Sequence, residues 1–231
     1  LDVYGNQNFI QQFITSKFPK EIKWKRRDIN VVNFDIEVAS DDGFPHASEA
    51  LHPIVSIALK SSKSSVYHVW GLDDYDVEKT PHKHLTIQYR KCKSEVELLA
   101  KFLEHWRNDY PDIITGWNIR FFDIPYIVNR LARVGSDKAV KALSPWGLVS
   151  ERQVSFKGRN MDAYELTGIG MMDYYDLFQK WGYTYGPQES YTLNHISSVV
   201  LGEKKLDFGE ASDLNELHEN DYKKFIDYNI K

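Results

Sequence analysis

The sequence predicts an α/β fold, in which helices flank a mixed and partly parallel sheet. The first observation is the apolar segment 31–38, which is typical of a strand buried on both faces in the middle of a sheet. The second is the alternation of strand-like and helix-like segments over residues 94–134, which favours a partly parallel sheet. The third is the length of 231 residues, enough for one sizeable domain with a buried core.

Two carboxylates interrupt the strand at residues 31–38. Asp35 and Glu37 are two residues apart, so on a strand both project from one face. Two like charges in a buried strand are costly unless a cation compensates them. Mg²⁺ and Mn²⁺ are hard cations that prefer carboxylate oxygens, so the pair predicts a metal site. The alternative is a strand end that carries two solvated acids.

The composition limits the kinds of partner that the chain can have. A net charge of −4 and a pI near 6.1 give no global basic signature, so any contact with nucleic acid must use local patches. The single cysteine, Cys92, rules out an internal disulfide and suits a reducing compartment. No apolar run approaches membrane-spanning length, so we expect no membrane contact.

Residues 1–28 predict an arm or linker ahead of the main domain. Segment 8–18 is rich in apolar residues and is followed by Pro19, which indicates a short structured arm. Segment 23–27 is basic with one aromatic residue, and it favours a solvated linker over a contact with a nucleic-acid backbone. Because the chain begins with Leu1 rather than Met, we expect it to be a piece of a longer polypeptide.

A loop and two strands are predicted after the acidic strand. The turn residues of segment 40–45 indicate a loop, whose Phe44 either stacks on a base or covers the edge of the core. Segments 53–60 and 65–70 are typical of strands, and the turn at 60–64 between them predicts an antiparallel pair.

The clearest predicted helix covers residues 94–108, where Ser94 and Glu97 form a capping box. A strand at 112–118 then runs into a loop, and a second helix begins near residue 124. The apolar stripe of the first helix comprises Val96, Leu99, Phe102, Leu103 and Trp106.

The rest of the chain predicts a long polar hairpin at 149–169 and a strand that leads into a helix at 170–178. A helix at 192–201 is closed by Gly202, and a final helix covers residues 221–231. Since a protruding polar hairpin buries little core, it either contacts a partner or simply extends the fold.

Several polar residues are expected to be structural. His82 and His84 lack neighbouring thiols or carboxylates, which favours a solvated loop over a metal site. Asp173 and Asp176 are three residues apart, so they do not share a strand face. His195 is expected on a helix surface or in the core.

Two acidic segments resemble motifs of one known family. Segment 34–38 is similar to the first exonuclease motif of family B DNA polymerases, most of all those of T-even-type phages. Segment 115–127 resembles their second motif, with Asn118, Phe122 and Asp123 at its signature positions. Taken alone, an Asp before a proline-initiated helix is as readily an N-terminal cap as a catalytic group. The resemblance implies a ribonuclease H-like sheet with a protruding hairpin.

The third motif of this family is Tyr-x-x-x-Asp on a late helix. Tyr228 supplies the Tyr, and the Asp would fall directly after Lys231. Asp227 is a poor substitute, because it lies about 140° around the helix from that position. We therefore expect residues 1–28 to be an arm from a preceding polymerase domain, and residues 29–231 to be an exonuclease domain truncated within its third motif.

The function implied by the resemblance is 3′–5′ proofreading by the exonuclease domain of a replicative DNA polymerase. It implies two-metal hydrolysis of the 3′-terminal phosphodiester of single-stranded DNA, with two divalent ions, Mg²⁺ or Mn²⁺. The implied metal ligands are Asp35, Glu37 and Asp123, and Tyr228 is implied to orient the attacking water. The residues implied to hold the unstacked 3′ end are Phe44, Asn118 and Phe122.

The implied partners are the single-stranded 3′ end, primer–template DNA, and a polymerase domain in the same chain or as a separate subunit. In this family the hairpin helps to separate primer from template, which assigns that role to residues 152–165. A phage protein of this kind is expected in the host cytoplasm. The alternative is a catalytically incomplete subunit of a split polymerase that binds DNA or its partner.

Overall fold

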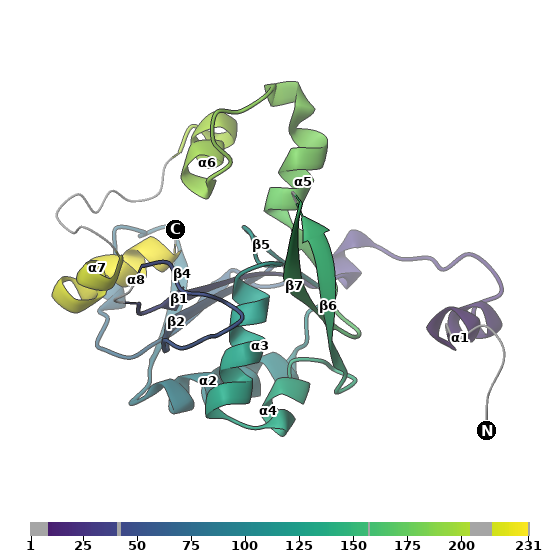
Figure 1. The fold of residues 1–231 in the computed structure, drawn as a ribbon, viewed down its shortest axis with the longest axis horizontal. Helices are drawn as coiled ribbons and strands as arrows, with labels where there is room; N and C mark the ends of the chain where they lie inside the picture. Colours follow the sequence, from purple (N-terminus) through teal and green to yellow (C-terminus); the bar gives the residue numbers. More distant parts are fainter. Residues whose placement is uncertain (1–8, 41–42, 157, 204–213, 231) are drawn as a thin grey trace.

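A six-stranded mixed sheet forms the centre of the molecule, with the strand order β4-β3-β2-β1-β5-β8 (Figure 1). This computed structural model describes residues 9–40, 43–156, 158–203 and 214–230. The strands are β1 (Val31–Val38), β2 (Ile54–Ser61), β3 (Val66–Gly71), β4 (Thr86–Lys91), β5 (Ile113–Gly116) and β8 (Gly170–Asp173). β2 is antiparallel to both of its neighbours, whereas β3–β4, β1–β5 and β5–β8 are parallel pairs. The α/β class and the antiparallel β2–β3 pair predicted from the sequence are confirmed.

Helices cover both faces of this sheet. α2 (Glu95–Asn108) and α3 (Asp123–Val134) bury their apolar sides against one face, with α4 (Asp137–Lys141) packed beside α3 (Figure 1). α7 (Leu214–Asn220) and α8 (Tyr222–Ile230) close the other face over β2 and β3. The sheet is therefore buried between two apolar layers, as the near-continuous apolar run of β1 requires.

Three further segments lie outside this body. The helix α1 (Phe9–Lys17) stands away from this body (Figure 1). It belongs to the arm predicted for residues 1–28, whose first eight residues lie outside the described residues. The strands β6 (Val149–Phe156) and β7 (Arg159–Leu166) form a separate antiparallel hairpin beside α3. The helices α5 (Tyr174–Trp181) and α6 (Leu193–Leu201) rise above the sheet, linked by a 3₁₀ turn at Gly182–Tyr185. Short 3₁₀ turns also occur at Arg26–Asp28 and Val77–Lys79.

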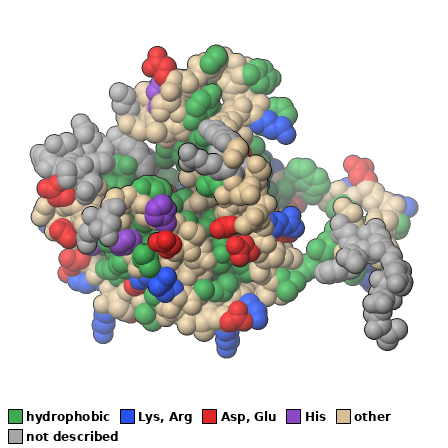
Figure 2. Space-filling view, viewed as in Figure 1, with side chains coloured by type: hydrophobic (Ala, Val, Ile, Leu, Met, Phe, Trp, Pro, Cys, Tyr) green, Lys and Arg blue, Asp and Glu red, His purple; other side chains and the backbone are tan. Residues whose placement is uncertain are grey.

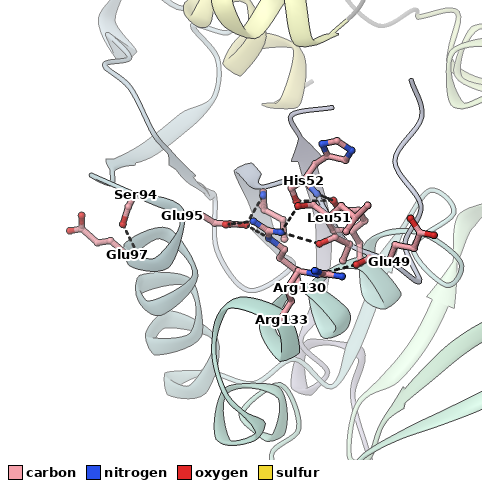
Figure 3. A network of polar contacts seen from close by, with 11 residues as sticks. Glu49, Leu51, His52, Ser94, Glu95, Glu97, Arg130 and Arg133 are labelled. Carbon is pink, nitrogen blue, oxygen red and sulfur yellow. Dashed lines mark hydrogen bonds and ion pairs between the residues drawn. The ribbon is translucent and has the colours of Figure 1, made fainter. Parts of the chain in front are cut away.

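A buried ion pair fixes α3 to α2 (Figure 3). The Arg130 guanidinium donates to both carboxylate oxygens of Glu95 at 2.8 and 2.7 Å, and also to the carbonyls of Ala50 and Leu51. Glu95 in turn accepts the backbone N–H of Ile54. One residue of α3 thus anchors both the neighbouring helix and the connection between β1 and β2. Breaking one partner of such a pair typically costs about 3–5 kcal/mol, because the other charge stays buried.

The predicted cap of α2 is present, but its apolar stripe is shifted. The Ser94 hydroxyl accepts the Glu97 backbone N–H, while the Glu97 carboxylate accepts from Lys93 rather than closing the box on Ser94. Val96, a member of the predicted stripe, is 61% exposed, and Leu98 is buried instead. Helical periodicity therefore predicts the helix correctly, but the buried face that it predicts is rotated around the helix axis from the observed one.

The expectation of a solvated loop at His82 and His84 holds for His84, which is exposed in a turn, and is wrong for His82. His82 is buried, and its Nε2 lies 3.0 Å from the backbone carbonyl of Asp227 on α8. Its backbone N–H also donates to the Thr80 hydroxyl. The histidine therefore holds the β3–β4 connection against the last helix, a contact with a residue far away in the sequence.

The surface carries mixed charge on the face drawn in Figure 2. Lys and Arg side chains of the described residues lie at separate places around the body, with Asp and Glu among them. This distribution agrees with the net charge of −4. Within the described ranges, no helix has the length and apolarity needed to cross a membrane.

Candidate functional site

The two acids of β1 share one face of the strand. The side-chain Nδ2 of Asn229 on α8 lies 2.8 Å from Asp35 Oδ2 and 3.4 Å from Glu37 Oε1, so one amide reaches both. Phe34, which precedes them, and Ile36, which lies between them, are buried in the apolar core on the opposite side. The same-face prediction is thereby confirmed.

Asp123 approaches this strand from the start of α3. Its Oδ1 accepts the backbone N–H of Ile36 at 3.1 Å, and the residue is only 3% exposed. The contact exists because β5 pairs with β1 only as far as Thr115 and Asn33, which leaves the next stretch of β1 without a strand on that side. Asp123 is the first residue of α3 and not its N-cap, and its carboxylate accepts the backbone N–H of the residue between Asp35 and Glu37.

A close approach of the chain makes this geometry possible. Gly116 ends β5, and a Cβ at this position would lie 2.6 Å from the carbonyl oxygen of Phe34. Any other residue would push the following loop away from β1. The loop then turns at Asn118, whose φ of 63° lies in the left-handed region that Asn tolerates better than most residues. Together these residues deliver Asp123 to the edge of β1.

The electrostatics of Asp123 reflect crowding by like charge. Burial raises the pKa of Asp123 well above its ordinary value, and the nearby Asp35 raises it further. The Ile36 N–H opposes this rise, and Glu37 adds a smaller increase. Asp123 is thus a buried carboxyl group close to Asp35 and Glu37, which are half-buried, and a cation near these groups would offset the penalty on its charge.

The donor set of the site consists of oxygen ligands, which fits a hard divalent cation better than a soft one. Within the part of the chain that the structure describes, however, no three His, Cys, Asp or Glu side chains form a group that could hold a metal ion. Asp123 directs Oδ1 to the β1 backbone, and Asn229 bonds to both Asp35 and Glu37. The carboxylates converge without forming a closed coordination shell.

Tyr228 lies next to the acidic pair. It lines a cavity of about 300 Å³ together with Asp35, Trp117 and Tyr174. The residue before it faces elsewhere: the Asp227 carboxylate is buried and accepts hydrogen bonds from Tyr75, Thr80 and Lys223. Asp227 is thus structural, as its position around the helix predicts, and the Asp expected after Lys231 lies outside the described residues.

Two of the three predicted DNA-contact residues lie together. Phe44 is 77% exposed, and its ring lies 4.9 Å from that of Phe122 at an angle of 44°. Phe122 directly precedes Asp123, so the aromatic pair lies beside the acidic site. Asn118 is at the other end of the same loop, where its backbone N–H donates to Asp173.

Asp173 has a purely structural set of partners. Its two carboxylate oxygens accept the backbone N–H groups of Asn118, Arg120 and Tyr175, which fixes the 118–120 loop and caps α5. Its neighbour Asp176 pairs with the Arg120 guanidinium at 3.0 Å. Both aspartates are structural in this arrangement, as the sequence predicts. His195, on α6, bonds to Gln188.

Sequence reasoning missed two polar residues of the site. Asn229 is 7% exposed, and its Oδ1 accepts the hydroxyl of Ser56, which is itself fully buried on β2. The sequence carries one signal for Asn229, namely a polar residue on the inward stripe of the last helix. Nothing in the local pattern of β2 indicates the role of Ser56.

Comparison with known proteins finds similarity to the exonuclease domains of DNA polymerases. The sequence model described as "DNA polymerase family B, exonuclease domain" matches residues 8–196. The DNA-directed DNA polymerase of Escherichia phage RB69 is 32% identical over 250 residues, covering all of this chain and 27% of that protein. That of Enterobacteria phage T4 is 27% identical with the same coverage. The DNA polymerase delta catalytic subunit of Mesocricetus auratus is 30% identical over 206 residues, 82% of this chain and 17% of that protein.

These relatives are much longer than the chain, which spans about a quarter of the length of the two phage polymerases. The mixed six-stranded sheet flanked by helices agrees with the ribonuclease H-like fold implied by the resemblance. Because the family match covers most of the 231 residues, the chain belongs to the exonuclease domain family of the family B DNA polymerases, and it resembles the T-even-type phage members.

Proposed function

We propose that this chain is the 3′–5′ proofreading exonuclease domain of a replicative DNA polymerase, which hydrolyses the 3′-terminal phosphodiester of single-stranded DNA. The observation that carries the proposal is the approach of Asp123 to β1, where its carboxylate bonds to Ile36 between Asp35 and Glu37. Residues 87 positions apart supply this contact. A structural role alone gives little reason to place a buried acid beside two half-buried ones.

The residues that would hold two divalent ions, Mg²⁺ or Mn²⁺, are Asp35, Glu37 and Asp123. When bound, such ions lower the pKa of an attacking water and offset charge on the scissile phosphate. The oxygen donors and the raised pKa of Asp123 support this assignment, because a cation would relieve the repulsion from Asp35.

Tyr228 would orient the attacking water by a hydrogen bond from its phenol. Its place beside Asp35 in the same cavity supports this role. Phe44 and Phe122 would stack on bases of the 3′ end, since stacking on exposed rings is how single strands are held without sequence preference. Asn118 would add a polar contact from the far end of the loop.

Proofreading follows from how often the 3′ end of the primer unpairs and reaches the site. A mismatched 3′ end unpairs at lower cost than a matched one, so it reaches a site that accepts only a single strand more often. The hairpin residues 152–165 would keep the primer apart from the template.

We also propose that residues 1–28 form an arm from a preceding polymerase region and that residues 29–231 form the exonuclease domain. A polymerase domain would act in the same polypeptide, in the host cytoplasm.

The test is a nuclease assay on the longest polypeptide that carries these residues. The substrate is a 5′-labelled single strand, with Mg²⁺ or Mn²⁺ and with EDTA as the metal-free control. We expect stepwise shortening from the 3′ end that requires metal and is lost in Asp35→Ala. A single strand left intact with both metals would refute the proposal. The alternative, a non-catalytic binding subunit, predicts that outcome, and the family match does not favour it.

A further inference from the structure

The amide of Asn229 is the direct link between α8 and the acidic pair. Its Nδ2 donates to Asp35 Oδ2 at 2.8 Å and to Glu37 Oε1 at 3.4 Å, and its Oδ1 accepts the Ser56 hydroxyl at 2.9 Å. Both donors and the acceptor of the side chain are therefore engaged. Asn229 and Ser56 are buried, so these contacts are shielded from competition by water.

The two carboxylates determine which way the amide faces, and the Ser56 hydroxyl donates to the amide oxygen on the other side. With Oδ1 on Ser56, both N–H groups are directed to the carboxylates. The reversed amide would direct its oxygen at two carboxylates, which is unfavourable because no donor would lie between them. Ser56 also pairs directly with Glu37 across β1 and β2, so the hydroxyl and the acid are held in one register.

A neutral donor suits a site that is proposed to take divalent ions. A lysine or arginine at this position would neutralise the acids itself and compete with the metal. An amide supplies two N–H donors without a positive charge, and it takes one acceptor position on each carboxylate. It can thus fix the two side chains while their negative charge is retained.

The helix that carries Asn229 is anchored independently of the acids. The Tyr222 hydroxyl accepts the Leu72 backbone N–H at 2.7 Å, and the Asp227 carboxylate binds Tyr75 and Thr80. Apolar residues of α8 are also buried against β2 and β3. The contacts of Asn229 are therefore not needed to dock the helix, which leaves the placement of Asp35 and Glu37 as their main consequence.

We propose that Asn229, which accepts a hydrogen bond from Ser56, is a positioning residue that holds Asp35 and Glu37 in the geometry required for divalent metal binding. This inference rests on the proposed function. Groups that orient metal ligands from outside the coordination shell typically change metal affinity about 10–100-fold when removed. Because Tyr228 directly precedes Asn229, the same contact also ties the position of the phenol to that of the acids.

The experiment compares two substitutions on the same helix in the 231-residue chain. Asn229→Leu keeps the branched shape of the side chain but removes its hydrogen bonds, and Tyr222→Phe removes an anchor of α8 that does not touch the acids. Mn²⁺ affinity is measured by titration calorimetry, and thermal unfolding is measured in EDTA. We expect Asn229→Leu to weaken Mn²⁺ binding about 10–100-fold. Tyr222→Phe should lower the unfolding temperature and leave the Mn²⁺ affinity unchanged.

Two further measurements separate positioning from general damage. Ser56→Ala is a milder change that leaves Asn229 in place, and we expect it to weaken Mn²⁺ binding less than Asn229→Leu does. In a ¹H–¹⁵N spectrum, the side-chain amide signals of Asn229 should shift in Asp35→Ala and should keep their positions in Tyr222→Phe. If those signals do not shift in Asp35→Ala, the contact is absent and the inference is wrong.

The outcomes distinguish this inference from the proposed function. If the unmodified chain binds no Mn²⁺, or if Asp35→Ala binds it as well as the unmodified chain, the proposed metal site fails and the inference fails with it. If Asp35→Ala abolishes binding while Asn229→Leu leaves it unchanged, only the inference is overturned. A weaker affinity in Asn229→Leu that accompanies an unfolding loss larger than that of Tyr222→Phe also overturns it, because the role is then structural.

Discussion

Asp123 and Asp173 are two buried aspartates at the start of helices, yet they have different surroundings. Burial is the largest cause of a raised pKa at both carboxyls. At Asp173, the N–H groups of Asn118, Arg120 and Tyr175 oppose that rise. Asp123 accepts the N–H of Ile36, and the charge of Asp35 adds to its rise.

The comparison shows that burial by itself does not identify a chemical group. Asp173 sits in a pocket of backbone donors, which is how a fold uses a carboxylate to hold a loop and cap a helix. Asp123 faces other carboxylates, an arrangement that costs stability unless a cation joins it. The identity of the facing groups therefore separates the candidate ligand from the structural cap.

The largest expected difference between these aspartates is in nuclease activity. Asp123→Asn should lower metal-dependent trimming of single-stranded DNA by more than about 100-fold, because losing a proposed ligand should exceed the 10–100-fold cost of an outer contact. Asp173→Asn should retain most activity if the variant is assayed below its unfolding temperature. The measurement is the initial rate of 3′ shortening, and equal losses in the two variants would remove the distinction.

Local pattern predicted much of this site but not its long-range contacts. The two-residue spacing of Asp35 and Glu37 predicts that their side chains share one face of the strand, because side-chain direction alternates from residue to residue. The burial of His82 escaped prediction because its partner on α8 is 145 residues away. The edge strand β4 was also missed, since its residues are mostly exposed or half-buried and lack a core strand's apolar run.

The second difference concerns stabilisation by metal. A ligand that binds only the folded state stabilises it by about 2.7 kcal/mol at 100 times its dissociation constant. We expect Mn²⁺ to raise the unfolding free energy of the unmodified chain and of Asp173→Asn by a similar amount. Asp123→Asn should gain much less. Denaturant titrations with Mn²⁺ and with EDTA measure the gain, and a full gain in Asp123→Asn would argue against its role as a ligand.

A third difference is expected in the unfolding free energy without metal. We expect substitution by Asn to lower it at position 173 and not to lower it at position 123. Asn at 173 presents an NH₂ group where the carboxylate accepts backbone N–H groups on both oxygens, so we expect a loss of about 1–3 kcal/mol. Asn at 123 can still accept from Ile36 through its oxygen, and it removes the repulsion with Asp35. The unfolding free energy in EDTA at pH 7 should therefore stay unchanged or rise. A loss at both positions would mean that Asp123 is also held mainly as a cap.

The smallest expected effect is the loss of stability at acid pH that His68 causes. It determines the pH at which the Asp123 and Asp173 variants should be compared. Burial, together with the neighbouring His105 and Arg90, lowers the pKa of His68 to about 4. Because the folded state then binds fewer protons than the unfolded state, the stability that His68 contributes is present above pH 6.5 and is lost as the pH falls towards 4. His68→Gln can still accept from Arg90, whose guanidinium donates to His68 Nδ1, but it does not titrate. The fall in unfolding free energy between pH 7 and pH 5 should therefore be smaller in His68→Gln than in the unmodified chain. An equal fall in both would assign the acid sensitivity to other groups, and the two aspartates would then have to be compared at several pH values.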